Sequence, residues 1–161
     1  MQFDLGDIFE IHRKLCPSPS YSTFKCAAML AAMGCCGNPS SVHAEGRIAK
    51  GIIEKARQQV ADAVGATGAD VVFTSGATEA AALALAGRGL SSGAIEHDAV
   101  NAWGSADLAV VNGNVQVATP SRSTLQLANS ETGIIQSLPQ RLAVSDITQG
   151  FGRIPFALSW S

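Results

Sequence analysis

The chain has 161 residues, 47% of them apolar and 15% charged, with a formal net charge of −2. This composition is typical of a globular protein with room for one domain, and without a basic run it gives no support to nucleic-acid binding. No apolar stretch reaches the roughly 18 residues of a membrane span. Acidic residues close to the N-terminus are unlike a signal peptide, so we expect a cytoplasmic protein.

Residues 1–26 carry the weakest structural signals. A short helix is expected over 8–15, and two prolines interrupt the chain after it, at positions 17 and 19. The four cysteines all lie in the first quarter of the chain, at positions 16, 26, 35 and 36. Adjacent cysteines make a poor disulfide and lack the Cys-x-x-Cys spacing of a zinc or redox site, so we expect ordinary thiols and no metal site.

Beyond a loop at 38–46, helical and strand-like segments alternate. An amphipathic helix is expected over 48–64, because its apolar residues form one stripe, and Gly65 gives it a left-handed end. Further helices are expected at 27–33, 78–86 and 97–103, and strands at 71–74, 93–96, 109–111, 115–118, 125–128 and 143–146. This alternation predicts an α/β fold, with a sheet covered on both faces by helices.

The segment from Val71 to Glu79 predicts an anion site. An apolar strand would lead through a tight turn at Gly76 into a helix, whose first N–H groups and positive dipole end attract phosphate. The hydroxyls of Ser75 and Thr78 would add donors. A plain helix start capped by Ser75 is the alternative, and the segment matches neither a Walker loop nor a Gly-x-Gly-x-x-Gly fingerprint.

Two polar residues end further strands. His97 would lie at the carboxyl end of a strand, where α/β proteins bind ligands, although a structural histidine beside a capping Asp98 is the simpler interpretation. Asp146 closes an apolar strand. A carboxylate there needs a cation, a metal or a protonated ligand nitrogen if it is buried, or else it is exposed to solvent.

Five motifs occur in order along the chain. They are Gly37-Asn38-Pro39-Ser40-Ser41-Val42-His43, Thr74-Ser75-Gly76-Ala77-Thr78-Glu79, Glu96-His97, Ala128-Asn129-Ser130-Glu131-Thr132-Gly133, and Asp146-Ile147-Thr148-Gln149 with Gly152-Arg153-Ile154-Pro155. Together they resemble the cysteine desulfurases of the pyridoxal phosphate-dependent class V aminotransferase family. The resemblance runs from about Ala27 to Pro155.

The resemblance implies a fold and a set of roles. The fold would be part of the fold type I large domain, a mostly parallel sheet flanked by helices, over residues 27–161. Residues 1–26 match the family poorly, and disorder is the expectation for them. Ala77 and Thr78 would bind the phosphate of pyridoxal phosphate. His97 would stack on the pyridine ring and transfer protons, which makes it the catalytic candidate. Asp146 would pair with the ring nitrogen and Gln149 with the phenolic oxygen.

Three departures from the family pattern stand out. Ser130 replaces an asparagine that contacts the cofactor in the family, so Asn129 and Ser130 are candidates for a substituted contact. The stretch from Asn129 to Asp146 is short, which predicts a trimmed helix. The Schiff-base lysine, the nucleophilic cysteine and the substrate-binding arginine of the family lie beyond the matched region, and the last lysine here is Lys55.

We therefore expect a truncated chain that is inactive alone. The implied complete enzyme converts L-cysteine to alanine, passes sulfur as a persulfide to an acceptor or scaffold protein in iron–sulfur cluster assembly, and forms a homodimer. A non-enzymatic remnant that binds pyridoxal phosphate, another phosphate ligand or a protein partner is one alternative; another class V aminotransferase or lyase is a second. Uncovered sheet edges and apolar faces would favour self-association or dependence on a partner.

Overall fold

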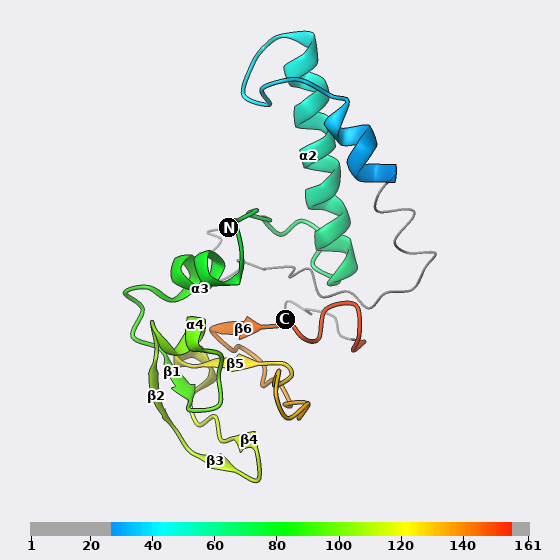
Figure 1. The fold of residues 1–161 in the computed structure, drawn as a ribbon. Coiled ribbons are helices and arrows are strands. Elements are labelled where there is room, and N and C mark those ends of the chain that lie inside the picture. Colours follow the sequence, from blue (N-terminus) through cyan, green and yellow to red (C-terminus); the bar gives the residue numbers. More distant parts are fainter. Residues whose placement is uncertain (1–26, 156–161) are drawn as a thin grey trace. The chain divides into compact units, whose positions relative to one another are not determined.

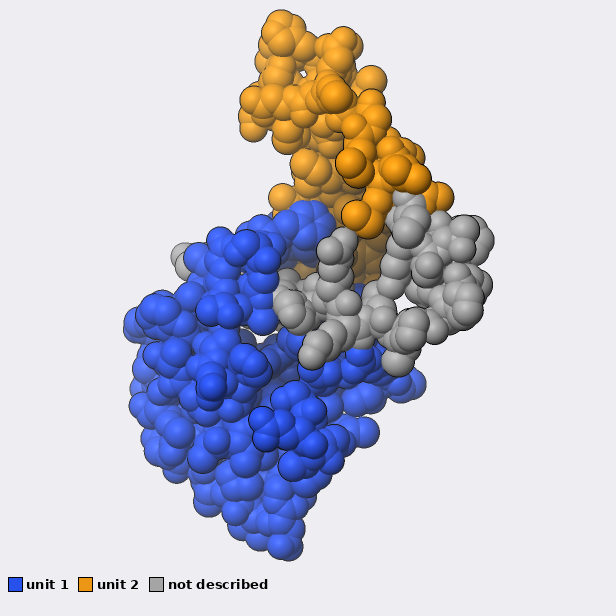
Figure 2. Space-filling view, viewed as in Figure 1, with its two compact units in different colours: residues 1–13, 70–156 blue, residues 14–69, 157–161 orange. Residues whose placement is uncertain are grey.

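A computed structural model describes residues 27–155. The helix expected over 8–15 and the apolar run at the C-terminus lie outside the described residues. The described chain divides into two compact units, residues 27–69 in unit 2 and residues 70–155 in unit 1 (Figure 2). That residues 27–161 form one domain stays a prediction.

Unit 2 consists of a short helix over residues 27–33 and the long helix α2 (Ala44–Ala63) (Figure 1). Both were predicted, although α2 begins four residues earlier than its apolar stripe. The left-handed end of α2 is confirmed, because Gly65 has a φ of 65°. Ahead of α2, the side chain of Asn38 accepts a hydrogen bond from the Ser40 N–H at 2.9 Å, which folds the Asn-Pro-Ser-Ser segment into a tight turn.

Unit 1 is built on short parallel strands. β1 (Ser91–Gly93) pairs with β2 (Ser105–Leu108), and β5 (Thr124–Gln126) pairs with β6 (Val144–Asp146), both in parallel. A parallel bridge from Ser91 to Ser123 joins the two pairs in the order β2-β1-β5-β6. The predicted parallel α/β architecture is therefore confirmed for this part of the chain.

Two helices accompany this sheet. α3 (Ala77–Leu85) packs against α4 (Asp98–Asn101), and α4 forms the crossover between β1 and β2. The apolar core of unit 1 includes Ala84 and Leu85 of α3, with Leu90 and Val100, against which Val144 of β6 packs. A small antiparallel hairpin of β3 (Val110–Val111) and β4 (Asn114–Val115) and a 3-10 turn at Pro120–Arg122 complete the described elements.

Several predicted elements change in the structure. The strand predicted at residues 71–74 is absent, because this segment pairs with no strand of the described chain. Val72 and Phe73, which were expected to be buried, are about half exposed. β2 was not predicted, because its residues Ser105 to Leu108 include no β-branched or aromatic side chain. Residues 127–143 contain turns and no helix, so the expected trimmed helix between Asn129 and Asp146 is wrong.

No helix in residues 27–155 has the length and apolar character needed to cross a membrane.

Candidate functional site

The first turn of α3 offers three backbone donors. Gly76 precedes the helix without a side-chain cap, and the first backbone hydrogen bond of the helix runs from the Ala80 N–H to the Gly76 carbonyl at 3.1 Å. The N–H groups of Ala77, Thr78 and Glu79 have no acceptor within the described residues. Together with the helix dipole, these N–H groups form a site that favours an anion.

Ser75 has a different role from the one predicted. Its N–H and its hydroxyl both donate to Oε2 of Glu79, at 2.7 and 2.6 Å. These two bonds lower the pKa of the Glu79 carboxyl, the hydroxyl contributing most. Ser75 is therefore occupied by the turn itself, whereas the exposed hydroxyl of Thr78 has no partner among the described residues.

His97 caps α4. Its Nδ1 accepts a hydrogen bond from the Ala99 N–H at 3.1 Å, which places the proton of the neutral ring on Nε2. Asp98 is the first residue of the helix rather than its cap, which corrects the simpler interpretation of this pair. The imidazole is exposed, so the cap holds the ring through Nδ1 while the rest of the ring remains accessible to a ligand.

The turn that carries His97 is fastened to β5. The carbonyl of Ile95 accepts hydrogen bonds from the side-chain amides of Gln126 and Asn129, at 2.8 and 2.9 Å. The Glu96 carboxyl accepts the Gln126 N–H at 2.8 Å, and the Glu96 carbonyl accepts the Asn101 amide at 3.0 Å. Sequence reasoning missed Gln126, although a glutamine within an apolar strand signals a buried polar group that needs partners.

Asn129 organises the loop after β5. Its Oδ1 accepts hydrogen bonds from the N–H groups of Glu131 and Thr132 and from the Thr132 hydroxyl, at 3.0, 2.8 and 3.0 Å. Only its second amide N–H is left for a ligand. Ser130, the other candidate for a substituted contact, is exposed and has no hydrogen bond within residues 27–155.

Asp146 and Gln149 follow each other at the end of β6. Oδ1 of the half-buried Asp146 accepts the Thr148 N–H at 2.9 Å, which leaves Oδ2 without a partner in the described chain. Oε1 of Gln149 accepts a hydrogen bond from Arg153 at 3.0 Å, so the Gln149 amide nitrogen remains the available donor.

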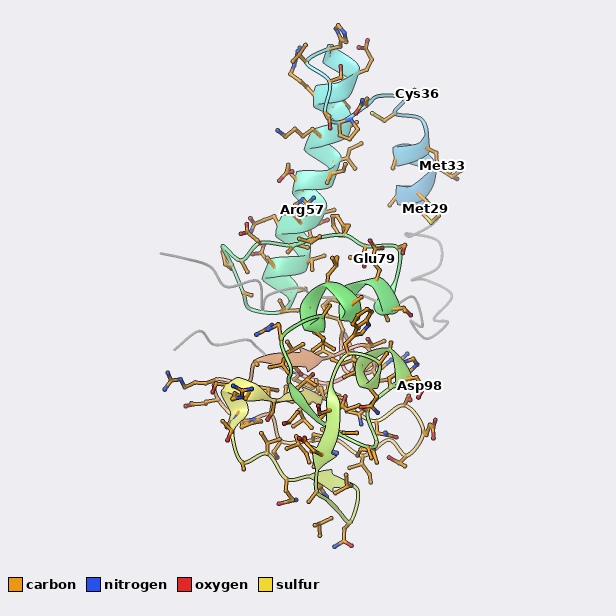
Figure 3. The ribbon with its side chains drawn as sticks, turned by 90° about the vertical axis from the view of Figure 1, so that its left-hand side faces the viewer. Met29, Met33, Cys36, Arg57, Glu79 and Asp98 are labelled. Carbon is orange, nitrogen blue, oxygen red and sulfur yellow. The ribbon has the colours of Figure 1, made fainter. Side chains whose placement is uncertain are left out.

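These residues gather at the carboxyl ends of parallel strands. The register pairs Gln126 with Asp146, and the turn after β1 is bound to Gln126, so the segments carrying His97 and Asp146 leave the sheet at one edge. Figure 3 shows Glu79 in the first turn of α3 and Asp98 at the start of α4. Unit 1 therefore combines anion donors, an accessible imidazole and a carboxylate.

Comparison with known proteins assigns the family. The sequence pattern of the family described as Aminotransferase class-V matches residues 25–106, about half of the chain. The chain belongs to the class V aminotransferase family. The match includes the α3 turn and His97, so these features lie within the shared region.

Relatives of this class V chain are cysteine desulfurases. It is 34% identical to a cysteine desulfurase of Frankia sp. (strain EuIK1), over 73% of this chain and 39% of that protein. It is 32% identical to cysteine desulfurase IscS 1 of Archaeoglobus fulgidus, over 71% of this chain and 36% of that protein. Among solved structures, a NifS-like protein from Rickettsia africae ESF-5 matches with a TM-score of 0.69 and 27% identity, over 96% of this chain and 49% of that one.

The class V chain therefore spans about two fifths of the length of these two curated relatives. The predicted relationship to the cysteine desulfurases is confirmed. The predicted partial α/β fold is also confirmed, by the NifS-like neighbour and by the parallel strands of unit 1.

Proposed function

We propose that this chain forms the pyridoxal phosphate-binding part of a cysteine desulfurase. The observation that carries the proposal is the set of unbonded N–H groups at the start of α3, in the same unit as a strand-end carboxylate with one unpartnered oxygen. The N–H groups would donate to the phosphate of the cofactor, and the carboxylate would pair with its protonated ring nitrogen. These are the two charged ends of pyridoxal phosphate.

The residues present fit such a group. The N–H groups of Ala77 and Thr78, with the Thr78 hydroxyl, hold the phosphate dianion at the positive end of α3. Gly76 brings no side chain to this turn, so the backbone stays open to an anion. Bound pyridoxal phosphate supplies an electron sink for bonds at the α-carbon of an amino acid.

Asp146 and Gln149 orient the ring. The free Oδ2 of Asp146 accepts a hydrogen bond from the ring nitrogen and keeps its proton in place, while the bond from Thr148 fixes the carboxylate plane. The amide nitrogen of Gln149 donates to the phenolic oxygen. Its Oε1 is already occupied by Arg153, which selects the orientation with the nitrogen as donor.

We infer that His97 would stack on the pyridine ring of the cofactor and take part in proton transfer. With its Nδ1 engaged by the Ala99 N–H, the neutral ring offers its Nε2–H, which can donate a hydrogen bond to a substrate. A proton transfer by His97 would require Nδ1, which holds the basic lone pair of the ring, to release the Ala99 N–H and take up a proton.

The substrate and partners follow the relatives. We infer that the substrate is L-cysteine, that the products are alanine and a persulfide on a protein thiol, and that a sulfur acceptor or scaffold protein receives the sulfur. A homodimer and a cytoplasmic location belong to the same proposal. This part of the proposal is supported by the names of the two relatives, both cysteine desulfurases.

The cofactor assignment is tested by binding. Titration of the purified chain with pyridoxal phosphate, followed by cofactor absorbance and fluorescence, should show saturable binding. Asp146→Asn should raise the dissociation constant by about tenfold, about 1.4 kcal/mol, because an amide oxygen is a weaker partner than a carboxylate for a protonated nitrogen. Asparagine still accepts the Thr148 N–H, so the turn persists.

Asp107→Asn is the matched control, since Asp107 lies exposed on β2 and should leave the affinity unchanged. Equal affinities for all three proteins would contradict the assignment. The substrate assignment is tested separately in a hybrid, where this chain replaces the matching part of the Frankia relative. A hybrid that binds pyridoxal phosphate and releases no alanine from L-cysteine would contradict the desulfurase reaction and leave the cofactor proposal standing.

A further inference from the structure

A buried carboxyl group connects two parts of the proposed site. The Glu96 side chain precedes His97 and is only 5% exposed. Its Oε1 accepts the Gln126 N–H at 2.8 Å, and its Oε2 is buried without a hydrogen-bond partner. Because Gln126 pairs in register with Asp146, Glu96 links the turn that carries His97 to the strand beside Asp146.

The surroundings of Glu96 favour its neutral form. An ionised carboxylate would leave one buried charged oxygen unpartnered, which is costly. Burial raises the pKa of Glu96 from 4.5 to about 7; the Gln126 N–H opposes this rise, and the negative charge of Asp146 adds to it. β1 and β5 bring no charged side chain, and the titratable neighbours His97 and Asp98 are exposed.

We propose that Glu96 is a positioning residue, which acts as a neutral carboxylic acid and fastens the turn that carries His97 to β5. In this form it contributes one hydrogen-bond acceptor to the Gln126 N–H and no second negative charge beside Asp146. Its relevance to the cofactor rests on the proposed function, whereas its charge state and its contact with β5 do not.

The charge state is tested by the pH dependence of stability. A group whose pKa is raised in the native state stabilises the fold fully below its unfolded pKa, and this contribution is lost as the pH rises through the native value. Urea unfolding of the whole chain should therefore show stability falling between pH 4.5 and about 7. Glu96→Gln should abolish this fall, because glutamine keeps the acceptor for Gln126 and carries no ionisable group.

Glu79→Gln serves as the matched control. Glu79 is exposed and its pKa is lowered, so its contribution to stability changes only below pH 4.5. The loss of stability above pH 4.5 should therefore persist in Glu79→Gln. A fall that remains in Glu96→Gln would overturn the proposal.

Two spectroscopic measurements complete the test. In carboxyl carbon NMR spectra of the glutamate-labelled chain, one signal should titrate near pH 7 and disappear in Glu96→Gln. This signal decides the question even if the variant does not fold, and an assigned Glu96 signal that titrates near its usual pH would overturn the proposal.

The positioning role is read from the imidazole signals of His97. Glu96→Ala should shift the His97 signals, because it removes the acceptor for the Gln126 N–H. Glu96→Gln keeps this acceptor and should show the wild-type signals. Equal spectra for Glu96→Ala and wild type would overturn the positioning role. None of these measurements needs a cofactor, so a chain that titrates as expected and fails to bind pyridoxal phosphate contradicts the proposed function alone.

Discussion

At the scale of single residues, His97 combines a structural and a chemical role. Its Nδ1 caps α4 through the Ala99 N–H, and its exposed ring is offered to a ligand. Removing the whole side chain would therefore lower stability and affinity together. A substitution that keeps the cap and removes the ring can separate the two roles.

We predict that His97→Ala lowers the free energy of unfolding by about 1 kcal/mol, the usual cost of a lost helix cap. His97→Asn should recover most of this stability, because asparagine caps helices well, and should still bind pyridoxal phosphate more weakly than wild type, since an amide cannot stack as an imidazole does. Urea unfolding and cofactor titration of both variants provide the measurement. If His97→Asn bound the cofactor as wild type does, the ring would have no part in binding.

At the scale of elements, the hairpin of β3 and β4 depends on its turn. Asn112 and Gly113 both have positive φ, 51° and 77°, which is the backbone of a two-residue hairpin turn. The side chain of Gln136 ties this hairpin to the rest of unit 1, with its Oε1 accepting the Val115 N–H at 3.1 Å and its amide donating to the Gly113 carbonyl at 2.7 Å. Strain in the turn should therefore affect the whole unit.

Gly113→Ala should lower the free energy of unfolding by at least about 1 kcal/mol, because alanine is strained at positive φ and its Cβ would collide with the Ile134 side chain. Gly51→Ala is the control within α2, where nothing lies within 4 Å of the new Cβ and alanine should stabilise the helix by about 0.5–1 kcal/mol. Circular dichroism during urea unfolding measures both. Equal destabilisation by the two variants would contradict this account of the turn.

At the scale of the whole molecule, large apolar side chains are exposed in unit 2. Leu30, Met33 and Ile48 are 69%, 73% and 59% exposed, more than a helix of a globular protein usually leaves in water. Part of the apolar stripe that predicted α2 is thus uncovered within the described chain, while Ala61 and Val64 at the end of that helix are buried.

We expect the purified chain to self-associate as its concentration rises, because burial of this surface removes apolar area from water. The double variant Leu30→Gln with Ile48→Gln should weaken the association, measured by sedimentation velocity. Val111→Gln, which changes a single exposed apolar residue of unit 1, should leave it unchanged. A wild-type chain that stays monomeric at every concentration would refute this prediction.

The sequence by itself determined the family, the long helix α2, the start of α3 and the order of the motifs. These features depend on contiguous residues, such as the periodic apolar stripe and the left-handed glycine at its end. Only the tertiary structure decided which polar groups are already occupied. Ser75 donates to Glu79, the Asn129 oxygen holds its own loop, and Glu96 is buried against a backbone group 30 residues away. Burial and distant partners arise from packing, which local patterns do not encode, and they leave Ala77, Thr78 and Asp146 with groups available for a ligand.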